Sequence, residues 1–277
     1  MRVAPPAADR YAVIGYPVAH SRSPFIHAMF ARQTGQNLSY ERLEAPPESF
    51  ERVVREFIAA GGRGLNVTLP HKEAAASLVD RLTERAARAG AVNTIVVTER
   101  GLLGDVTDGA GLVRDLTSNL GLQLRGTRVR LVGAGGAARG VLGPLLAERP
   151  ARIDIVNRNA LRAEQLAAAF AADGEVHAGG LDAFPGAAAD LVINATSASL
   201  EGVVPFMPEG IVGPRTVCYD MAYAPGGTEF TRWALAAGAN RAVPGWGMLV
   251  EQAAESFELW RGVRPQTAAV LRALQTG

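Results

Sequence analysis

The sequence has a single cysteine, no long hydrophobic run and no excess of charge of either sign, and each shortage excludes a class of protein. Cys218 cannot form an internal disulfide, and its apolar setting in TVCYD favours a buried strand residue over a nucleophile. No run of about 18 apolar residues occurs, and the start MRVAPPAADR lacks the apolar core of a signal peptide. We therefore expect a cytoplasmic protein without a membrane segment.

The 28 basic and 27 acidic side chains nearly cancel, so the chain has no overall basic face for nucleic acid or a membrane surface. The expected partner is therefore a small molecule. With 277 residues, of which 48% are hydrophobic, the chain is long enough for one large or two ordinary domains. The four histidines show no metal-ligand spacing, so no metal site is predicted.

Short strand-like runs alternate with longer helical runs, which is typical of an α/β fold. The first series contains YAVIG, 24–34, LSYERLE, 48–60, GLNVTL, 71–79 and AVNTIVV. The second series contains RVRLVGAGG, RIDIVNR, 160–172, DLVINAT and TVCYDM. Between them, GDVTDGAGLVRDLTSNLG carries Leu112, Val113, Leu116 and Leu120 on one helical stripe, and we expect the domain junction there.

The segment RVRLVGAGGAA supplies a strand, a glycine-rich turn and a helix in that order. Gly133, Gly135 and Gly136 allow a tight turn whose backbone N–H groups can reach a pyrophosphate at the helix N-terminus. The next strand, RIDIV, ends about 20 residues later, as a dinucleotide-binding unit requires. A tight turn without a ligand is the alternative, but three glycines within four residues favour the nucleotide.

The residues after that strand favour NADP over NAD. An NAD site usually has Asp or Glu here for the ribose hydroxyls, whereas this chain reads NRNALRAE. Arg158 and Arg162 lie one helical turn apart and can clamp a 2′-phosphate through charge-assisted hydrogen bonds. Asn157 and Asn159 can serve as helix caps, and a solvated helix charge is the alternative role of Arg162.

Two serines flank an arginine in HSRSPFIHAMF, at the expected start of a helix over 24–34. Pro24 suits the first helical position, and Ser23 can cap the free N–H groups. One hydroxyl suffices for a cap, so this interpretation leaves Ser21 without a role. Two hydroxyls at a helix N-terminus would also suit a small anion such as a carboxylate. The local pattern leaves both interpretations open.

Further polar residues stand where open α/β sheets usually bind ligands. Asn66 and Thr68 end an apolar strand in GLNVTLP. Lys72 begins the following helix, where its positive charge is unfavourable against the helix dipole. It is either a surface charge or a residue with a functional role. Asn93 interrupts the apolar run AVNTIVV and needs a partner if it is buried. Asp108 is either a helix cap or, beside a nicotinamide, the acid–base partner of Lys72.

Along nearly its whole length, and in order, the chain resembles the shikimate dehydrogenase family. The matching stretches are YAVIGYPVAHSRSPFIH, GLNVTLPHKEAA, AGAVNT, VTDGAG, GAGGAAR, NRN, INATS, YDMAYAP and GWGMLVEQAAESFELW. The resemblance implies NADPH-dependent reduction of 3-dehydroshikimate to shikimate, a step of aromatic amino-acid biosynthesis. It also implies two α/β domains. One is a substrate domain with a mostly parallel sheet over 1–107 plus 246–277, and the other is a Rossmann-type NADP domain over 108–245, with the last helix returning to the substrate domain.

The resemblance also implies a role for each matching residue. Lys72 and Asp108 match the family's catalytic pair. The residues that match substrate contacts are Ser21 and Ser23 at the carboxylate with Tyr223 nearby, and Asn66, Thr68, Asn93 and Gln252 at the ring and its hydroxyls. The residues that match cofactor contacts are Gly133, Ala134, Gly135, Gly136 and Ala137 in the phosphate loop, Asn157, Arg158, Asn159 and Arg162 around the adenosine phosphate, and Thr196, Gly245 and Met248 around the nicotinamide.

Two positions depart from the family pattern. Val106 stands where the family usually has asparagine, and after NATS the chain has Ala198 and Ser199 where the family usually has a glycine one residue on. A paralogue acting on quinate or an aminoshikimate is the alternative enzyme. A catalytically silent ligand-binding or regulatory protein is the alternative from another class, and retention of both Lys72 and Asp108 argues against it. The family contains monomers and homodimers, and the sequence does not decide between them.

Overall fold

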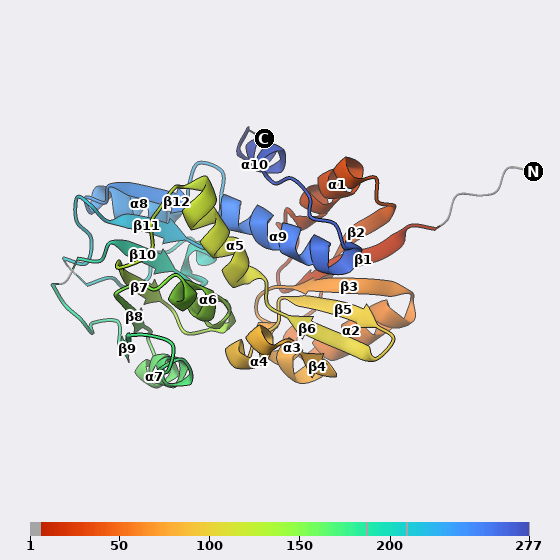
Figure 1. The fold of residues 1–277 in the computed structure, drawn as a ribbon, viewed down its shortest axis with the longest axis horizontal. Coiled ribbons are helices and arrows are strands. Elements are labelled where there is room, and N and C mark those ends of the chain that lie inside the picture. Colours follow the sequence, from red (N-terminus) through yellow and green to blue (C-terminus); the bar gives the residue numbers. More distant parts are fainter. Residues whose placement is uncertain (1–6, 187, 209, 277) are drawn as a thin grey trace, which may run out of the picture. The chain divides into compact units, whose positions relative to one another are not determined.

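The computed structural model describes residues 7–186, 188–208 and 210–276. The chain divides into two compact units (Figure 1). The first unit consists of the chain up to Thr107 together with Leu249–Thr276, and the second consists of Asp108–Met248. The second crossing between the units falls inside helix α9 (Trp246–Arg261). Each unit is built around one six-stranded sheet, which confirms the predicted α/β class.

The first unit contains a mixed sheet with strand order β2-β1-β3-β5-β6-β4. Its elements are β1 (Asp9–Gly15), α1 (Ser23–Thr34), β2 (Leu38–Glu44), the 3₁₀ turn η1 (Pro47–Ser49), α2 (Phe50–Ala59), β3 (Gly62–Val67), α3 (Lys72–Leu78), β4 (Arg81–Leu82), α4 (Glu84–Ala89), β5 (Thr94–Thr98), β6 (Gly101–Asp105), most of α9, and α10 (Ala268–Thr276). Strand β1 pairs in parallel with β2 and β3, and β4 pairs in parallel with β6, which agrees with a mostly parallel sheet.

The antiparallel direction of β5 brings polar residues to one edge of this sheet. Strand β5 runs antiparallel to β3 with Asn66 opposite Thr94, and β6 runs antiparallel to β5 with Asp105 opposite Thr94. The end of β3, the start of β5 and the end of β6 therefore share one edge. Lys72 follows the same end of β3, at the first position of α3. The segments that carry Asn66, Lys72 and Asn93 thus converge there.

The second unit contains an all-parallel sheet with strand order β12-β11-β10-β7-β8-β9. Its elements are α5 (Asp108–Arg114), the π-helical turn η2 (Asp115–Asn119), β7 (Arg128–Val132), α6 (Gly136–Ala147), β8 (Arg152–Val156), α7 (Ala160–Ala169), β9 (Val176–Gly179), β10 (Leu191–Asn194), the 3₁₀ turn η3 (Ala198–Glu201), β11 (Val217–Asp220), α8 (Glu229–Ala236) and β12 (Arg241–Pro244). The strand order reverses between β7 and β10, and open α/β sheets bind ligands beyond the carboxyl ends of strands at such a point.

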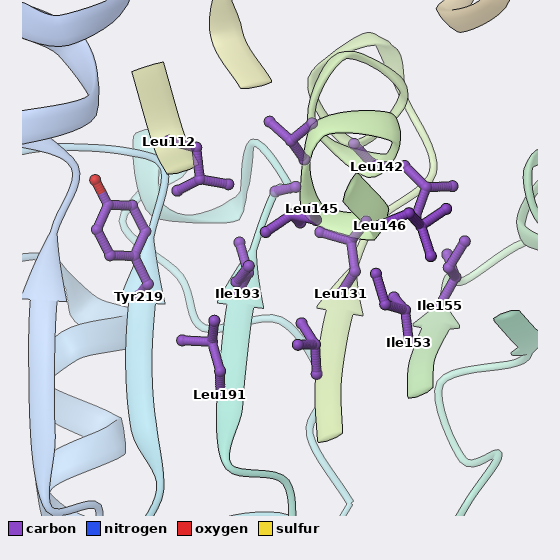
Figure 2. Packing of buried hydrophobic residues seen from close by; sticks show 14 of the residues in the cluster. Leu112, Leu131, Leu142, Leu145, Leu146, Ile153, Ile155, Leu191, Ile193 and Tyr219 are labelled. Carbon is purple, nitrogen blue, oxygen red and sulfur yellow. The ribbon is translucent and has the colours of Figure 1, made fainter. Parts of the chain in front are cut away.

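The core of the second unit packs helix α6, which follows the glycine-rich turn, against the sheet. Figure 2 shows the leucines of α6, among them Leu142 and Leu145, pointing onto the side chains of β7, β8 and β10. Both leucines are at most 1% exposed, and burying a leucine contributes about 2 kcal/mol. Helix α6 is therefore fixed against the strand that precedes the turn.

Two further observations bear on earlier expectations. Cys218 is fully buried in β11, and burial raises the pKa of its thiol to about 12, so it is not a nucleophile. Over the described residues, no helix has both the length and the apolar character needed to span a membrane.

Candidate substrate and cofactor sites

The two serines of the opening motif meet at the start of α1. The hydroxyl of Ser21 donates to the hydroxyl of Ser23 over 3.2 Å, and both side chains are at most 6% exposed. Arg42, on the neighbouring strand β2, donates from Nε over 2.9 Å to the carbonyl of Ser21 and so holds the turn. The first turn of α1 has no side-chain cap and no acidic residue. Two hydroxyls beside uncapped N–H groups suit a carboxylate.

The expectation that Ser23 caps this helix is wrong. Helix α1 begins at Ser23 itself, and Arg22 occupies the cap position without a capping hydrogen bond. The N–H of Ser23 instead donates to Oγ of Ser21 over 3.3 Å. The helix starts one residue earlier than predicted because Pro24 is tolerated anywhere in the first turn, where no intrahelical donor is needed.

Asn66 lies at the end of β3 within a buried polar group. Its Oδ1 accepts from the hydroxyl of Tyr40 over 2.7 Å, and its Nδ2 donates to Oγ of Ser256 over 2.9 Å. His27 stacks on the ring of Tyr40 with the ring centres 4.2 Å apart. Burial lowers the pKa of His27 to about 3, against the opposing effect of the Asn66 side chain, so His27 is neutral at physiological pH. Thr68 follows β3 and is partly exposed.

Asn93 has the partners that its burial requires. Its Oδ1 accepts from the backbone N–H of Thr107 over 2.7 Å, and its Nδ2 donates to Oε1 of Gln252 over 3.2 Å. Asn93 is 2% exposed and Gln252 is 9% exposed. Two of the residues matched to the substrate ring are thus joined directly, although 159 positions separate them in the chain.

Val106 takes an apolar place beside this network. Its side chain is 2% exposed and belongs to the hydrophobic core of the first unit. The adjacent Thr107 supplies the polar contacts at this point, because both its N–H and its hydroxyl bond to Asn93. The departure at Val106 is therefore accommodated by packing.

Lys72 is buried to 9% exposure at the first position of α3. It is the only lysine in the chain, and every other one of the 28 basic side chains is arginine. Its helix is anchored by His71, whose Nε2 lies 2.7 Å from the carbonyl oxygen of Ala45 and whose ring stacks on Phe50. Position 72 is thus the one basic position in the sequence that carries a lysine ammonium in place of an arginine guanidinium.

Asp108 begins α5 in the second unit and is 4% exposed. Its neighbour Gly109 allows α5 to approach α6 closely, because a Cβ there would lie 2.5 Å from the carbonyl oxygen of Gly140 and 2.4 Å from Pro144. No larger residue fits without moving a helix backbone. The position of Asp108 in its unit is therefore set by this helix contact.

The glycine-rich turn has the form that a phosphate site needs. Gly133 has φ +113°, a conformation that side chains rarely adopt, and Gly135 stands at the cap position of α6. The first turn of α6 has neither a side-chain cap nor an acidic residue, and a Cβ on Gly135 would meet no atom within 4 Å. Gly136 and Ala137 continue into α6, while Ala134 is buried in the core. Free N–H groups beside open space fit a pyrophosphate.

The residues after β8 present two exposed guanidinium groups. Arg158 and Arg162 are both exposed, and no Asp or Glu stands between the end of β8 and Arg162. The Nδ2 of Asn157 donates to the carbonyl of Asn159 over 2.9 Å, which shapes this turn. Asn159 takes the cap position of α7 without a capping side-chain bond, so the suggestion that these asparagines cap the helix is wrong at the level of the side chain. The charges suit a phosphate monoester.

Three matched residues lie after the carboxyl ends of β10, β11 and β12, and a fourth, Met248, lies in α9. Thr196 donates from Oγ1 to Oδ1 of Asn194 over 2.7 Å, and the N–H of Gly245 donates to the carbonyl of Ala222 over 2.9 Å. The ring of Tyr223 lies 4.6 Å from that of Trp246. Met248 is buried in the second unit's core, and its N–H bonds to the hydroxyl of Tyr219.

Among the described residues, no group of three metal-ligating side chains converges.

Sequence reasoning did not single out Tyr40 and Ser256. Both bond directly to Asn66, and Ser256 is fully buried. Tyr40 lies on a strand in which it alternates with charged residues, and Ser256 lies in a helix rich in alanine. The one available signal was that Ser256 follows Gln252 by four positions and so shares its helix face.

The fold and these sites define a class of protein. A mixed α/β unit with a buried polar edge and a lysine is joined to an all-parallel Rossmann-type unit with a phosphate turn, which describes a dinucleotide-dependent dehydrogenase. Family models match three segments: the shikimate dehydrogenase substrate binding domain over residues 13–95, shikimate/quinate 5-dehydrogenase over 115–215, and the shikimate 5'-dehydrogenase C-terminal domain over 245–275.

Full-length relatives agree with these matches. A shikimate dehydrogenase (NADP(+)) of Alkalilimnicola ehrlichii is 56% identical over 96% of this chain and 98% of its own. The crystal structure of a Thermus thermophilus shikimate 5-dehydrogenase in complex with NADP(H) and shikimate is 34% identical, with a TM-score of 0.84 over 97% of this chain and 99% of its own. A 5-ketofructose reductase of Gluconobacter is 29% identical, with a TM-score of 0.81 over 97% and 98%. The chain belongs to the shikimate dehydrogenase family.

Proposed function

We propose that this chain is an NADP-dependent dehydrogenase that interconverts 3-dehydroshikimate and shikimate, a step of aromatic amino-acid biosynthesis. Relatives named shikimate dehydrogenase (NADP(+)) are 52% to 56% identical to it over 96% of the chain. The observation that carries the proposal in the structure is the burial of the only lysine, Lys72, next to the end of β3 and the start of β5, where Asn66 pairs with Thr94. A ketone reductase needs one group that can both give and take a proton at this place.

Most of the proposed substrate contacts lie in the first unit. The hydroxyls of Ser21 and Ser23, with the start of α1, bind the substrate carboxylate, and Tyr223 contributes from the second unit. Asn66, Thr68, Asn93 and Gln252 contact the ring and its hydroxyls. Because Asn93 and Gln252 are bonded to each other over 3.2 Å, they act as one rigid surface.

The proposed cofactor contacts lie in the second unit. Gly133–Ala137 and the N-terminus of α6 hold the pyrophosphate, and Arg158 and Arg162, with Asn157 and Asn159, hold the 2′-phosphate. Thr196, Gly245 and Met248 surround the nicotinamide. NADPH supplies the hydride when it is bound. The donor set fits NADP because Arg158 and Arg162 follow β8 and no carboxylate stands between the end of β8 and Arg162.

Lys72 and Asp108 carry the proton chemistry. In the reduction, the ammonium of Lys72 donates a proton to the oxygen of the C3 ketone as that oxygen gains negative charge, and the C3 hydroxyl forms. In the oxidation, the amine of Lys72 takes that proton back. By its match to the family, Asp108 is the second member of the proposed catalytic pair. Arginine could not serve, because its guanidinium does not release a proton under physiological conditions.

The proposal is tested by following nicotinamide absorbance with purified protein. We expect NADP⁺ to be reduced rapidly with shikimate, more slowly with quinate, and poorly when NAD⁺ replaces NADP⁺. A preference for quinate or NAD⁺ would instead indicate a paralogous dehydrogenase. Oxidation of NADPH by 5-ketofructose would indicate the activity named for the Gluconobacter relative. Shikimate binding without turnover would indicate a silent binder.

The proposal includes the state and location of the enzyme. We place it in the cytoplasm, where the reduced nicotinamide pool is available, and expect a monomer or a homodimer. Sedimentation of the purified chain distinguishes the two states. Fractionation of the producing cells tests the location.

A further inference from the structure

Ser256 lies at the centre of the polar group behind the proposed substrate site. Its Oγ lies 2.9 Å from Nδ2 of Asn66, 2.8 Å from Oγ1 of Thr94 and 3.3 Å from Oγ1 of Thr107. Its own proton can go to the carbonyl of Gln252, one helical turn earlier, over 3.1 Å. Ser256 is fully buried and belongs to the first unit, as do all four of these partners.

The hydrogen-bond partners of Asn66 determine the orientation of its side-chain amide. Three oxygens surround its Nδ2: Oγ of Ser256 at 2.9 Å, Oγ1 of Thr94 at 3.3 Å and the carbonyl oxygen of Asn93 at 3.4 Å. A carbonyl oxygen only accepts, so turning the amide over would set two acceptors against each other. The contact with Ser256 is the shortest of the three and therefore the strongest.

Tyr40 fixes the other end of the same amide. Its hydroxyl donates to Oδ1 of Asn66 over 2.7 Å. Burial raises the pKa of Tyr40 well above its ordinary value, so this hydroxyl keeps its proton. Both hydrogens on Nδ2 and one lone pair on Oδ1 are then committed to the protein. What Asn66 can offer a ligand is the second lone pair of Oδ1.

We propose that Ser256 is a positioning residue that acts through Asn66 and makes it a hydrogen-bond acceptor for one ring hydroxyl of the substrate. This inference rests on the proposed function, which places the substrate ring against Asn66. An acceptor of fixed orientation favours a ring that carries a hydroxyl at that position and disfavours one that carries hydrogen or a carbonyl there. Ser256 thus contributes to specificity without touching the substrate.

The test compares wild type, Ser256→Ala and Ser256→Cys, with Thr216→Ala as the control. Thr216 is also buried, at 1% exposure, and its hydroxyl donates to a backbone carbonyl in the second unit. Initial rates are measured with NADP⁺ and shikimate, 4-deoxyshikimate or 5-deoxyshikimate. We expect wild type to lose at least about tenfold in kcat/KM with one deoxy analogue, since a site built for a hydroxyl rejects the analogue that lacks it.

In Ser256→Ala the penalty for the missing hydroxyl should fall to about twofold, because the amide loses the shortest of its three Nδ2 contacts and is held less firmly in its orientation. The KM for NADP⁺ should stay within about twofold of wild type, and Thr216→Ala should keep the wild-type penalty. A general loss of packing lowers the rates with all three substrates alike and leaves the penalty unchanged. An unchanged penalty in Ser256→Ala would therefore overturn the proposal. If the alanine variant does not fold, Ser256→Cys decides by the same measurement, because a thiol is a weak acceptor of similar size.

A second readout needs no substrate and separates this inference from the proposed function. The side-chain NH₂ of Asn66 is followed by ¹H–¹⁵N NMR and assigned by its loss in Asn66→Asp. We expect slow hydrogen exchange in wild type and fast exchange in Ser256→Ala and Ser256→Cys. Equal exchange in wild type and both variants would overturn the inference even if shikimate is the substrate. Absence of shikimate turnover in wild type would overturn the proposed function alone.

Discussion

The hydroxyl of Ser199 donates a hydrogen bond to the carboxylate of Asp220, with 2.6 Å between the two oxygens. Thr228 donates to the same carboxylate over 2.6 Å, and Nδ2 of Asn194 donates to it over 3.1 Å. Asn194 also accepts from Thr196, the residue matched to the nicotinamide surroundings. Ser199, at the departure from the family glycine, therefore ties the turn after β10 to the end of β11.

We predict that Ser199→Gly weakens NADP⁺ binding and spares shikimate binding. The variant removes one donor from a buried carboxylate and frees the turn that follows Thr196, at a cost of about 1 kcal/mol in the free energy of unfolding. The KM for NADP⁺ should rise roughly fivefold, which corresponds to about 1 kcal/mol. Ser199→Ala removes the hydroxyl without adding backbone freedom and separates the two effects. A higher KM for shikimate alone would contradict this role.

Arg158 should contribute to cofactor choice. We predict that Arg158→Ala raises the KM for NADP⁺ by at least about tenfold, since a charge-assisted contact with the 2′-phosphate is lost. The KM for NAD⁺, which lacks that phosphate, should change by less than about twofold. Arg125→Ala, at another exposed arginine of the same unit, is the control. Equal losses with both cofactors would argue against a 2′-phosphate clamp.

The first-unit sheet shows where sequence reasoning succeeds and where it stops. The strand expected at LSYERLE has the bounds of β2, Leu38–Glu44, because alternation of half-buried and exposed residues is a local signal. Strand β6, Gly101–Asp105, was not predicted. Its sequence GLLGD contains two glycines and no alternation, and its pairing with β5 on one side and β4 on the other makes it a strand.

The residues of the candidate site also divide into those that the sequence indicates and those that it does not. Asn66 was singled out because it ends an apolar strand, Asn93 because it interrupts an apolar run, and Lys72 because a lysine in the first turn of a helix opposes the helix dipole. Ser256 was not found, because its role depends on a bond to Asn66, which lies 190 positions away in the chain. A serine in a helix gives no local sign of such a partner. The capping role predicted for Ser23 was also wrong. That role depends on the exact residue at which the helix begins, and α1 begins at Ser23 itself.

Asp105 links the stability of the first unit to pH. Burial opposes ionisation of this 2%-exposed residue, but hydrogen bonds from Arg85 and Thr83 outweigh burial and hold its pKa below the ordinary value. A carboxyl whose pKa is lower in the folded state stabilises the fold above the pKa of the unfolded chain, about 3.9. That stabilisation is lost as the pH falls through the folded-state pKa.

We therefore predict that Asp105→Asn lowers the free energy of unfolding at pH 7 by about 2 kcal/mol, the scale of a charged hydrogen bond beside a partly exposed partner. The difference from wild type should shrink as unfolding in urea is repeated at successively lower pH below about 4. Glu164→Gln, at an exposed position on α7, should change little at any pH. A difference that stays constant as the pH falls would contradict this account of the carboxylate.

Lys72 offers the sharpest test of the chemistry because it is the only lysine in the chain. We predict that Lys72→Met and Lys72→Arg both lower kcat by about 10³, the scale of a lost proton donor. The arginine variant keeps a positive charge but cannot exchange a proton, so it separates charge from proton transfer. Calorimetry should find shikimate binding within about fivefold of wild type in both variants, since the carboxylate and hydroxyl contacts remain. An amine-selective acylating reagent should attach, apart from the chain terminus, at Lys72 alone, and shikimate with NADP⁺ should slow that labelling and the accompanying loss of activity together. Turnover by the arginine variant near the wild-type rate would mean that charge alone is required, and the proton would then have to come from another group.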